Sequence, residues 1–384
     1  MDRRTFIGAG ATLSLTGFNS LALEATPYRS RRLLVVLLRG AMDGLSAIPP
    51  TGDPRLSDLR ASLVPKNLLP LNSFFAIHPV LGTFGDLVGR GQALAVHACG
   101  FAYTGRSHFE GQDIMQSGMS KAYTSGSGWL GRGMERSGLS SSVAISIPMP
   151  LLLRGDSQAE TQFPNWMQAP PAGTYALVSK LWAGTPELAE LGERLAGKRG
   201  EPSGGGSMSQ RFEQRKSPAG LAIEAATRMK PENGPMVGLI DFDGFDTHAS
   251  QGSDDGTQAR KLQQVDDVIK AFRDAMGARW ADSLVLTVTE FGRTVAENGT
   301  TGTDHGWASC ILAAGGLVKT AGVVADWPGL EKSKLFEGRD LKVTIDANAV
   351  YAQAMRSVLG LNLDQIQKEV LQFTPHPLTQ NLFA

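Results

Sequence analysis

Five groups of polar side chains follow or precede the most apolar segments of this sequence, and they include three of the six histidines. The groups are Asp43, Ser107 with His108, Asp246 with His248, Glu290, and Asp304 with His305. Carboxylates, imidazoles and one hydroxyl are the ligand types of a site for divalent metals such as zinc or manganese. The coincidence of five groups, rather than any single residue, indicates such a site.

Each group also has a structural explanation when it is taken alone. Asp43 precedes a glycine, which is typical of a turn, and Ser107 could be the N-cap of a helix that starts at "SHFEG". The segment "DFDGFDTH" faintly resembles a calcium loop but lacks the spacing and the closing Glu of an EF-hand. We interpret His78 and His97 as structural histidines, and we expect no catalytic role for His376, which lies between two prolines.

The elements that must position these groups alternate between strands and helices. Apolar strands are expected within 31–39, 92–100, 143–148, 234–243, 283–290 and 308–318. The segment 257–276 predicts an amphipathic helix, with Leu262, Val265, Ile269, Phe272 and Met276 on one face. A second helix is expected before Gly360, with Asp346 as its N-cap. Continuous apolar strands separated by helices favour an α/β fold, with a mainly parallel sheet covered on both faces.

Open sheets of this kind bind ligands beyond the carboxyl ends of their strands. We therefore expect the five groups to converge in one crevice. Two divalent ions about 4 Å apart would clamp a phosphoryl-like group there and activate a hydroxyl beside it.

The N-terminal segment predicts export. Arg3 and Arg4 precede Thr5, Phe6 and a weakly apolar stretch, which is the layout of a twin-arginine signal over residues 1–25. The stretch is shorter and more polar than the roughly 20 apolar residues of a membrane span. We expect the twin-arginine translocase as a partner, a periplasmic or exported protein, and no transmembrane span. Because this pathway carries folded proteins, the signal also favours a bound metal or cofactor.

Composition excludes several classes of protein. With 37 basic and 37 acidic residues among 384, the chain shows no electrostatic footprint for nucleic acid or an anionic membrane. Two cysteines, Cys99 and Cys310, exclude a disulfide scaffold, and we expect both as buried thiols. No composition shift marks a boundary, so residues 26–384 are expected to form a single domain in which 197–210 is a flexible surface loop.

Five motifs together resemble the bacterial DUF1501 family of twin-arginine-exported proteins. They are "LLRGAMDGL", "GRSHFEGQDIM", "GFDTH", "TEFGRT" and "GTDHG", in this order over essentially the whole mature chain. The family has no assigned function and is placed in the alkaline phosphatase-like superfamily, with phosphatases, sulfatases and phosphoglycerate mutases. The resemblance implies an alkaline phosphatase/sulfatase-like fold, with a mainly parallel central sheet and helices on both faces.

The superfamily pattern also implies roles for single residues. It makes Asp43 a ligand of one metal, Ser107 the nucleophile, Asp246 and His248 ligands of the other metal, and His305 its later histidine. The chain departs from the pattern at 290–293, where no histidine accompanies Glu290, and in the single residue that separates Asp246 from His248.

Because of these departures, the presence and the ligands of a second metal stay open. Glu290 and Asp304 are further candidate ligands; His108 or Asp304 would complete its shell, or Arg293 would replace the charge of the ion. We expect one or two divalent ions, zinc, manganese or calcium.

The expected activity is hydrolysis of a small phosphate or sulfate ester. Ser107 would attack in line and form a covalent intermediate, with a metal and Arg106 or Arg293 stabilising the equatorial oxygens. His108 belongs to the same candidate catalytic group. A metal-free esterase built from Ser107, His305 and Asp246 is a rival, although Phe109 stands where a G-x-S-x-G motif needs its second glycine. The other alternative is a non-catalytic periplasmic binding or assembly protein on the same fold.

Overall fold

The computed structural model describes residues 28–139, 141–162, 182 and 216–384. The signal expected at 1–25 and the loop expected at 197–210 lie outside the described residues. The chain divides into two compact units, Met1–Phe163 with Pro218–Ala384, and Pro164–Ser217. The elements below belong to the first unit, and the single domain over 26–384 stays a prediction.

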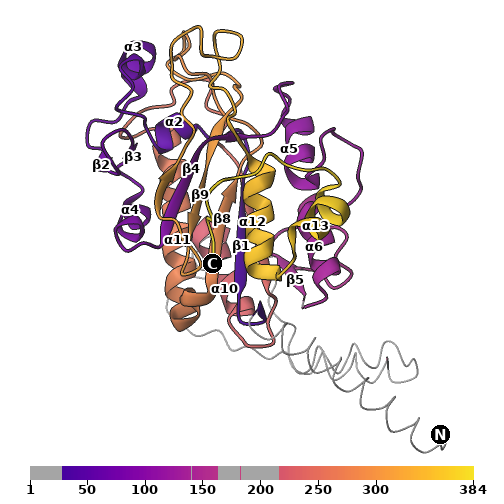
Figure 1. Cartoon of the computed structure of the whole chain (residues 1–384). Coiled ribbons are helices and arrows are strands. Elements are labelled where there is room, and N and C mark those ends of the chain that lie inside the picture. The colour runs from indigo at the N-terminus through magenta and orange to yellow at the C-terminus, as the bar shows by residue number, and fades with distance from the viewer. Residues whose placement is uncertain (1–27, 140, 163–181, 183–215) are drawn as a thin grey trace, which may run out of the picture. The chain divides into compact units, whose positions relative to one another are not determined.

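A nine-stranded sheet forms the centre of the described first unit, in the order β10-β4-β9-β8-β1-β7-β5-β6, with β11 beside β4. Its strands are β1 (Arg32–Leu38), β4 (Ala93–Gly100), β5 (Ser142–Ala144), β6 (Glu160–Thr161), β7 (Val237–Phe242), β8 (Ser283–Val288), β9 (Ser309–Ala314), β10 (Gly322–Val324) and β11 (Ile345–Asp346). Only β9 runs antiparallel, to both β4 and β8, while the other pairings are parallel. The predicted α/β fold with a mainly parallel sheet is confirmed (Figure 1).

The helices are α2 (Gly44–Ala47), α3 (Arg55–Arg60), α4 (Gly82–Gly89), α5 (His108–Ser117), α6 (Trp129–Ser137), α10 (Pro218–Met229), α11 (Thr257–Met276), α12 (Ala347–Leu359) and α13 (Leu363–Gln365). Short turns of helix add η2 (Ala61–Leu63), η3 (Leu151–Leu153), η4 (Gly277–Asp282) and η5 (Ile366–Leu371), and β2 (Leu69–Pro70) pairs with β3 (Ala76–Ile77). No helix in the described ranges has the length and apolar character that crossing a membrane requires.

Alternate side chains of β1 enter two separate cores, because successive residues of a strand point to opposite faces. Leu33, Val35 and Leu37 pack in a cluster with residues of α5, α6 and α12. Leu34, Val36 and Leu38 pack in a cluster with residues of α4, α10 and α11. The sheet is therefore covered on both faces, which is why its strands are apolar without alternation.

Both helices predicted from the sequence are confirmed. The helix α11 has the predicted bounds, and its predicted apolar face is buried. Asp346 caps α12 by accepting a hydrogen bond from the backbone N–H of Asn348 at 2.9 Å, and Gly360 ends the helix with φ +69°.

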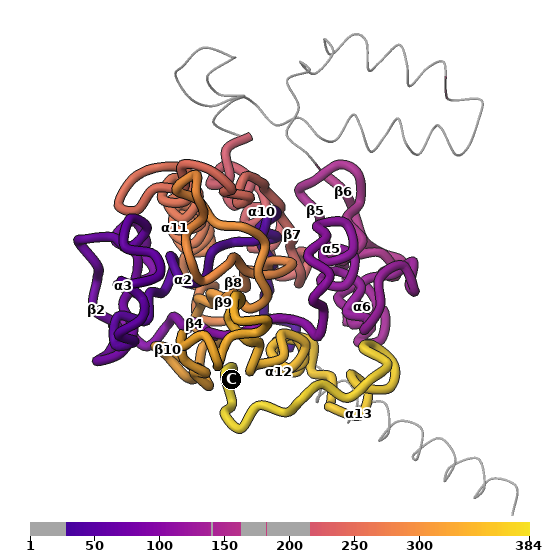
Figure 2. Tube along the Cα trace, turned by 90° about the horizontal axis from the view of Figure 1, so that it is seen from above, coloured from indigo at the N-terminus to yellow at the C-terminus, as the bar shows by residue number. Residues whose placement is uncertain are grey.

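Strand direction gathers several loops at one edge of the sheet. Leu37, near the end of β1, pairs with Asp241 in β7 and with Val288 in β8, so these strands end side by side. We call this edge, where β1, β4, β7 and β8 end, the carboxyl edge. The antiparallel β9 begins there, so the loop between β8 and β9 starts and returns at the same edge. Figure 2 looks onto it, with α5 on the side of β5.

Candidate functional site

Three histidines and one aspartate meet at the carboxyl edge. The Nε2 atoms of His248 and His305 lie 3.0 Å apart, and they lie 3.0 Å and 3.2 Å, respectively, from Oδ1 of Asp246. His108 Nε2 lies 3.0 Å from His305 Nε2 and 3.4 Å from Asp246 Oδ2. We call these four residues the histidine cluster. Ligand atoms of His108, Asp246 and His305 all lie within 4.8 Å of one another, so the group could hold a metal ion.

In each histidine of the cluster, the other ring nitrogen, Nδ1, is hydrogen-bonded to an acceptor. The Nδ1 partners are Glu290 Oε1 for His108 at 2.8 Å, Asp304 Oδ1 for His248 at 3.0 Å, and the backbone oxygen of Arg106 for His305 at 2.8 Å. An ionised carboxylate or a carbonyl can only accept, so Nδ1 carries the proton in all three rings. In the neutral form of this tautomer, the lone pair of Nε2 points at the shared point, as in metal sites whose histidines are oriented by outer partners.

Glu290 is buried behind His108, with 1% of its surface exposed. Burial raises the pKa of this carboxyl, but hydrogen bonds from His108, from the Gly40 N–H (2.8 Å) and from Gln112 Nε2 (3.2 Å) outweigh it and lower the pKa below the usual range. The same hydrogen bond raises the pKa of His108. Glu290 is therefore an ionised partner that orients His108. Likewise, a hydrogen bond from His248 lowers the pKa of Asp304.

The backbone at Gly40 makes this arrangement possible. Gly40 has φ +109°, and a Cβ placed there would lie 2.6 Å from the backbone nitrogen of Asp246. Only glycine allows both the left-handed backbone and the close approach. The turn after β1 can therefore donate to Glu290 while the turn after β7 packs directly on it.

Arg293 is fixed behind Asp246. Its side chain is fully buried and donates to Asp246 Oδ1 at 2.7 Å and to the Thr303 hydroxyl at 3.1 Å, with a further bond to the Thr303 carbonyl. Burial raises the pKa of Asp246, but the bond and charge of Arg293 outweigh it, so the pKa is lowered. Arg293 thus keeps Asp246 ionised and in place.

Asp43 forms a buried ion pair with Arg60. Arg60 Nη1 donates to its two carboxylate oxygens at 2.9 and 3.1 Å, and both side chains are 1% exposed. Asp43 also accepts from the Leu45 N–H, the Ser46 hydroxyl and Gln251 Nε2, so it caps α2. Arg60 supplies the positive charge that the sequence led us to expect from a metal.

Gln251 connects this ion pair to the cluster. Its Oε1 accepts from the hydroxyls of Thr247 (2.8 Å) and Thr303 (2.7 Å), and Thr303 in turn binds Arg293. Sequence reasoning missed Arg60, Gln251 and Thr303. Arg60 and Gln251 lie outside the five motifs, and Thr303 lies within "GTDHG" but was given no role there.

Ser107 precedes His108 at the start of α5. It occupies the N-cap position, but its side chain makes no capping bond to α5. A side-chain hydrogen bond between Ser107 and Tyr103 acts to lower the pKa of the Tyr103 phenol. The backbone N–H of Ser107 is fixed by the Tyr103 hydroxyl at 3.1 Å. The structural role considered for Ser107, capping through its side chain, is therefore not performed.

Arg106 contributes its backbone to the cluster rather than its guanidinium. Its φ of +56° presents the carbonyl to His305. The guanidinium pairs with Asp340 at 2.7 Å and with Glu337 at 2.6 Å. The Arg106 guanidinium is therefore engaged in two ion pairs.

A metal-free Ser-His-Asp arrangement does not match this geometry. In such a triad the aspartate holds Nδ1 of the histidine and the serine faces Nε2. In His305 the backbone of Arg106 holds Nδ1, and Asp246 lies at Nε2. Neither nitrogen is left for Ser107.

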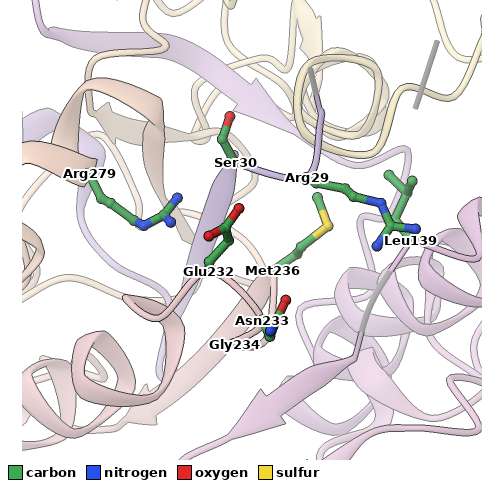
Figure 3. Close-up of a pocket in the computed structure, with 8 residues that line it drawn as sticks. All are labelled: Arg29, Ser30, Leu139, Glu232, Asn233, Gly234, Met236 and Arg279. Atoms are coloured by element: carbon green, nitrogen blue, oxygen red, sulfur yellow. The ribbon is translucent and has the colours of Figure 1, made fainter. Parts of the chain in front are cut away.

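A separate pocket of about 430 Å³ lies at the opposite edge of the sheet. Ser30 and Met236, which precede β1 and β7, line it with Arg29, Glu232 and Arg279 (Figure 3). It contains none of the predicted site residues.

Comparison with known proteins gives a family match without an activity. The family described as "Protein of unknown function (DUF1501)" matches residues 209–368, which confirms the expected resemblance over these residues. No curated protein matches the chain in sequence.

Several solved structures are similar at low identity. The PsFucS1 sulfatase from Pseudoalteromonas sp. is 13% identical, with TM-score 0.43 over 94% of this chain and 74% of that chain. The C-terminal periplasmic domain of EptC from Escherichia coli, in complex with Zn, is 10% identical, with TM-score 0.43 over 92% of each chain. A phosphonate monoester hydrolase of Agrobacterium radiobacter is 10% identical, with TM-score 0.40 over 90% of this chain and 78% of that chain.

Proposed function

We propose that the chain is a metal-dependent hydrolase of phosphate or sulfate esters, with its cation held by the histidine cluster. The observation that carries this proposal is the spacing of neighbouring ligand atoms, three imidazole nitrogens and the two carboxylate oxygens of Asp246: five separations among them lie at 3.0 to 3.4 Å. Ligands about 2.0–2.1 Å from one metal ion are separated by about 3.0–3.4 Å in octahedral or tetrahedral geometry. A nitrogen-rich set favours zinc or manganese over calcium.

Electrostatics supports the same proposal. With Nδ1 protonated in each ring, the Nε2 lone pairs and the carboxylate of Asp246 face one another and repel. A divalent cation satisfies all of them at once. Within the cluster, the nearby Arg293 donates a hydrogen bond to Asp246 and to none of the imidazoles.

The proposed ligands are His108, Asp246, His248 and His305, while Glu290 and Asp304 orient two of the rings. Asp43 has no part in this set, because Arg60 already neutralises it. One cation therefore accounts for the cluster. When bound, it supplies Lewis-acid stabilisation of the charge on the oxygens of an ester.

Ser107 is the proposed nucleophile. Its hydroxyl stands at the N-terminus of α5, where the first backbone N–H groups favour a negatively charged group. Attack forms a bond from Oγ to phosphorus or sulfur and breaks the bond to the alcohol oxygen, and the alcohol leaves with the proton. Water then cleaves the ester on Ser107 and restores the hydroxyl. Tyr103 holds the backbone of Ser107 in place for both steps.

The test is hydrolysis of aryl phosphates and aryl sulfates by protein loaded with zinc or manganese. We expect Ser107→Ala to lower the turnover of whichever ester is hydrolysed by about 10³-fold or more, because the nucleophile is lost. Metal content and melting temperature should stay those of the wild type. Thr104→Ala, an exposed hydroxyl of the same loop, is the matched control.

Full activity in Ser107→Ala would show that Ser107 is not the nucleophile. A wild type that binds metal and hydrolyses none of these esters would favour the alternative, a non-catalytic periplasmic binding or assembly protein. Twin-arginine export, proposed from Arg3 and Arg4, is common to both functions.

Cation binding should weaken as the pH falls. Binding requires neutral imidazoles, and the hydrogen bond to Glu290 raises the pKa of His108 above the ordinary value of about 6.5. Protons therefore compete for His108 already at a pH above that value. In the metal-free protein, pH has the opposite effect on the stability of the fold. The raised pKa of His108 stabilises the fold at low pH, and this contribution is lost as the pH rises through that pKa.

Calorimetric titration with zinc on both sides of the ordinary histidine pKa measures this effect. Glu290→Gln should shift the loss of affinity to lower pH, since it removes the carboxylate that favours the protonated ring. An affinity that is independent of pH would contradict the assignment of His108 as a ligand.

A further inference from the structure

An exposed aromatic side chain stands directly beside the histidine cluster. Phe109 follows His108 in the first turn of α5 and is 83% exposed, more than any other large apolar residue that the structure describes. The packing of the fold does not use this ring.

Helix geometry directs Phe109 toward the carboxyl edge. Residues three and four apart share a helix face, so Phe109 lies over Gln112 and Asp113. Gln112 donates to Glu290, so this face of α5 adjoins the cluster. Long side chains in helices lean toward the N-terminus, so we expect the ring of Phe109 on the side of the start of α5.

A second exposed aromatic is held on the same face. The backbone N–H of Tyr123 donates to Asp113 Oδ1 at 2.8 Å, one helical turn from Phe109. Tyr123 is 66% exposed and has φ +61°, a left-handed conformation that a tyrosine rarely adopts. The chain therefore holds this residue beside α5 in a strained backbone while its side chain faces solvent.

An exposed aliphatic residue precedes η3, the short helix that packs on α5. Further along the same face of α5, Gln116 accepts a hydrogen bond from the backbone N–H of Leu152, so η3 covers the lower end of this face. Ile147, in the segment that leads from β5 to η3, is 73% exposed. We call Phe109, Tyr123 and Ile147 the apolar rim.

We propose that the apolar rim binds the organic group of the substrate, and that the substrate is the phosphate or sulfate ester of an aromatic or similarly apolar alcohol. This inference rests on the proposed function. An ester has an anionic end, which the cation and the start of α5 would attract, and an organic end a few ångströms away. Phe109, next in sequence to a proposed ligand, is placed to contact that organic end. Aromatic rings stack on such groups with little loss of side-chain entropy.

The experiment compares two probes, phenylphosphonate, which has no ester bond to hydrolyse, and inorganic phosphate, by calorimetry on the zinc-loaded full chain. We expect the wild type to bind phenylphosphonate about tenfold more tightly than inorganic phosphate, the size of effect typical of one apolar contact. Phe109→Ala should lose this preference while its affinity for inorganic phosphate and for zinc stays unchanged. Ile223→Ala, which removes an exposed apolar side chain from α10, is the matched control and should keep the preference.

Binding of both probes with equal affinity by the zinc-loaded wild type would overturn this inference and leave the proposed function standing. A preference that both Phe109→Ala and Tyr123→Ala keep would also overturn this inference. So would a wild-type dimer that Phe109→Ala dissociates, because the rim would then bind a second copy of the chain. A wild type that binds no zinc would contradict the proposed function itself.

Discussion

Replacing His305 with alanine is expected to abolish binding of the divalent cation and the stability that the cation confers. His305 is the centre of the cluster, because its Nε2 lies within 3.2 Å of ligand atoms of His108, His248 and Asp246. A ligand that binds only the folded state stabilises it by about 2.7 kcal/mol at a free concentration one hundred times its Kd. Loss of the central ligand removes this contribution.

Scanning fluorimetry with and without chelator measures the effect. The wild type should melt at a lower temperature in chelator, whereas His305→Ala should melt at the same temperature in both conditions. His376→Ala, an exposed histidine outside the cluster, should respond to chelator as the wild type does. A His305→Ala variant that keeps one equivalent of metal would contradict the ligand assignment.

Replacing Arg60 with methionine is expected to lower the free energy of unfolding by about 3–5 kcal/mol, the range found when one partner of a buried ion pair is removed. The carboxylate of Asp43 would stay buried without its cation. The carbonyls of Thr294 and Val295 would also lose the hydrogen bonds that Arg60 donates.

Urea denaturation of the metal-loaded protein measures this change. Arg55→Met is the control from the same helix: its ion pair with Asp58 is exposed, so we expect a change of no more than about 1 kcal/mol. The double variant Asp43→Asn with Arg60→Met should recover part of the lost stability, since it leaves no buried charge. Equal effects of Arg60→Met and Arg55→Met would mean that Asp43 has another cationic partner.

Local signals in the sequence were sufficient for much of the fold. The helix α11 follows from apolar residues at helical spacing, and α12 follows from the Asp346 cap and Gly360. The strands β1, β4, β7 and β8 follow from apolar runs. The antiparallel direction of β9 could not be predicted, because an apolar run buried on both faces looks the same in either direction.

The sequence predicted which residues lie at the candidate site better than it predicted the role of each. Parallel strands end at one edge, so Asp246, His248 and Glu290 could be expected together. Whether a carboxylate faces the shared point or lies behind a ring depends on backbone direction and on hydrogen bonds that no motif encodes. Glu290, expected as a ligand, lies behind His108, which was expected in a catalytic role or in the shell of the second metal.

Asp43 shows the limit of reasoning from motifs. A carboxylate after the first strand suits a metal ligand as well as it suits a cap, and the sequence carries no sign of its true partner. Arg60 ends a short helix, and only the path of the chain between them brings its guanidinium to Asp43.

The most direct test of the central claim is elemental analysis of the wild type, purified from its native compartment without chelator. The proposed cluster of His108, Asp246, His248 and His305 predicts one divalent transition metal ion per chain, with zinc or manganese the expected elements. Absence of any stoichiometric divalent ion, both as purified and after incubation with zinc and manganese followed by desalting, would contradict it.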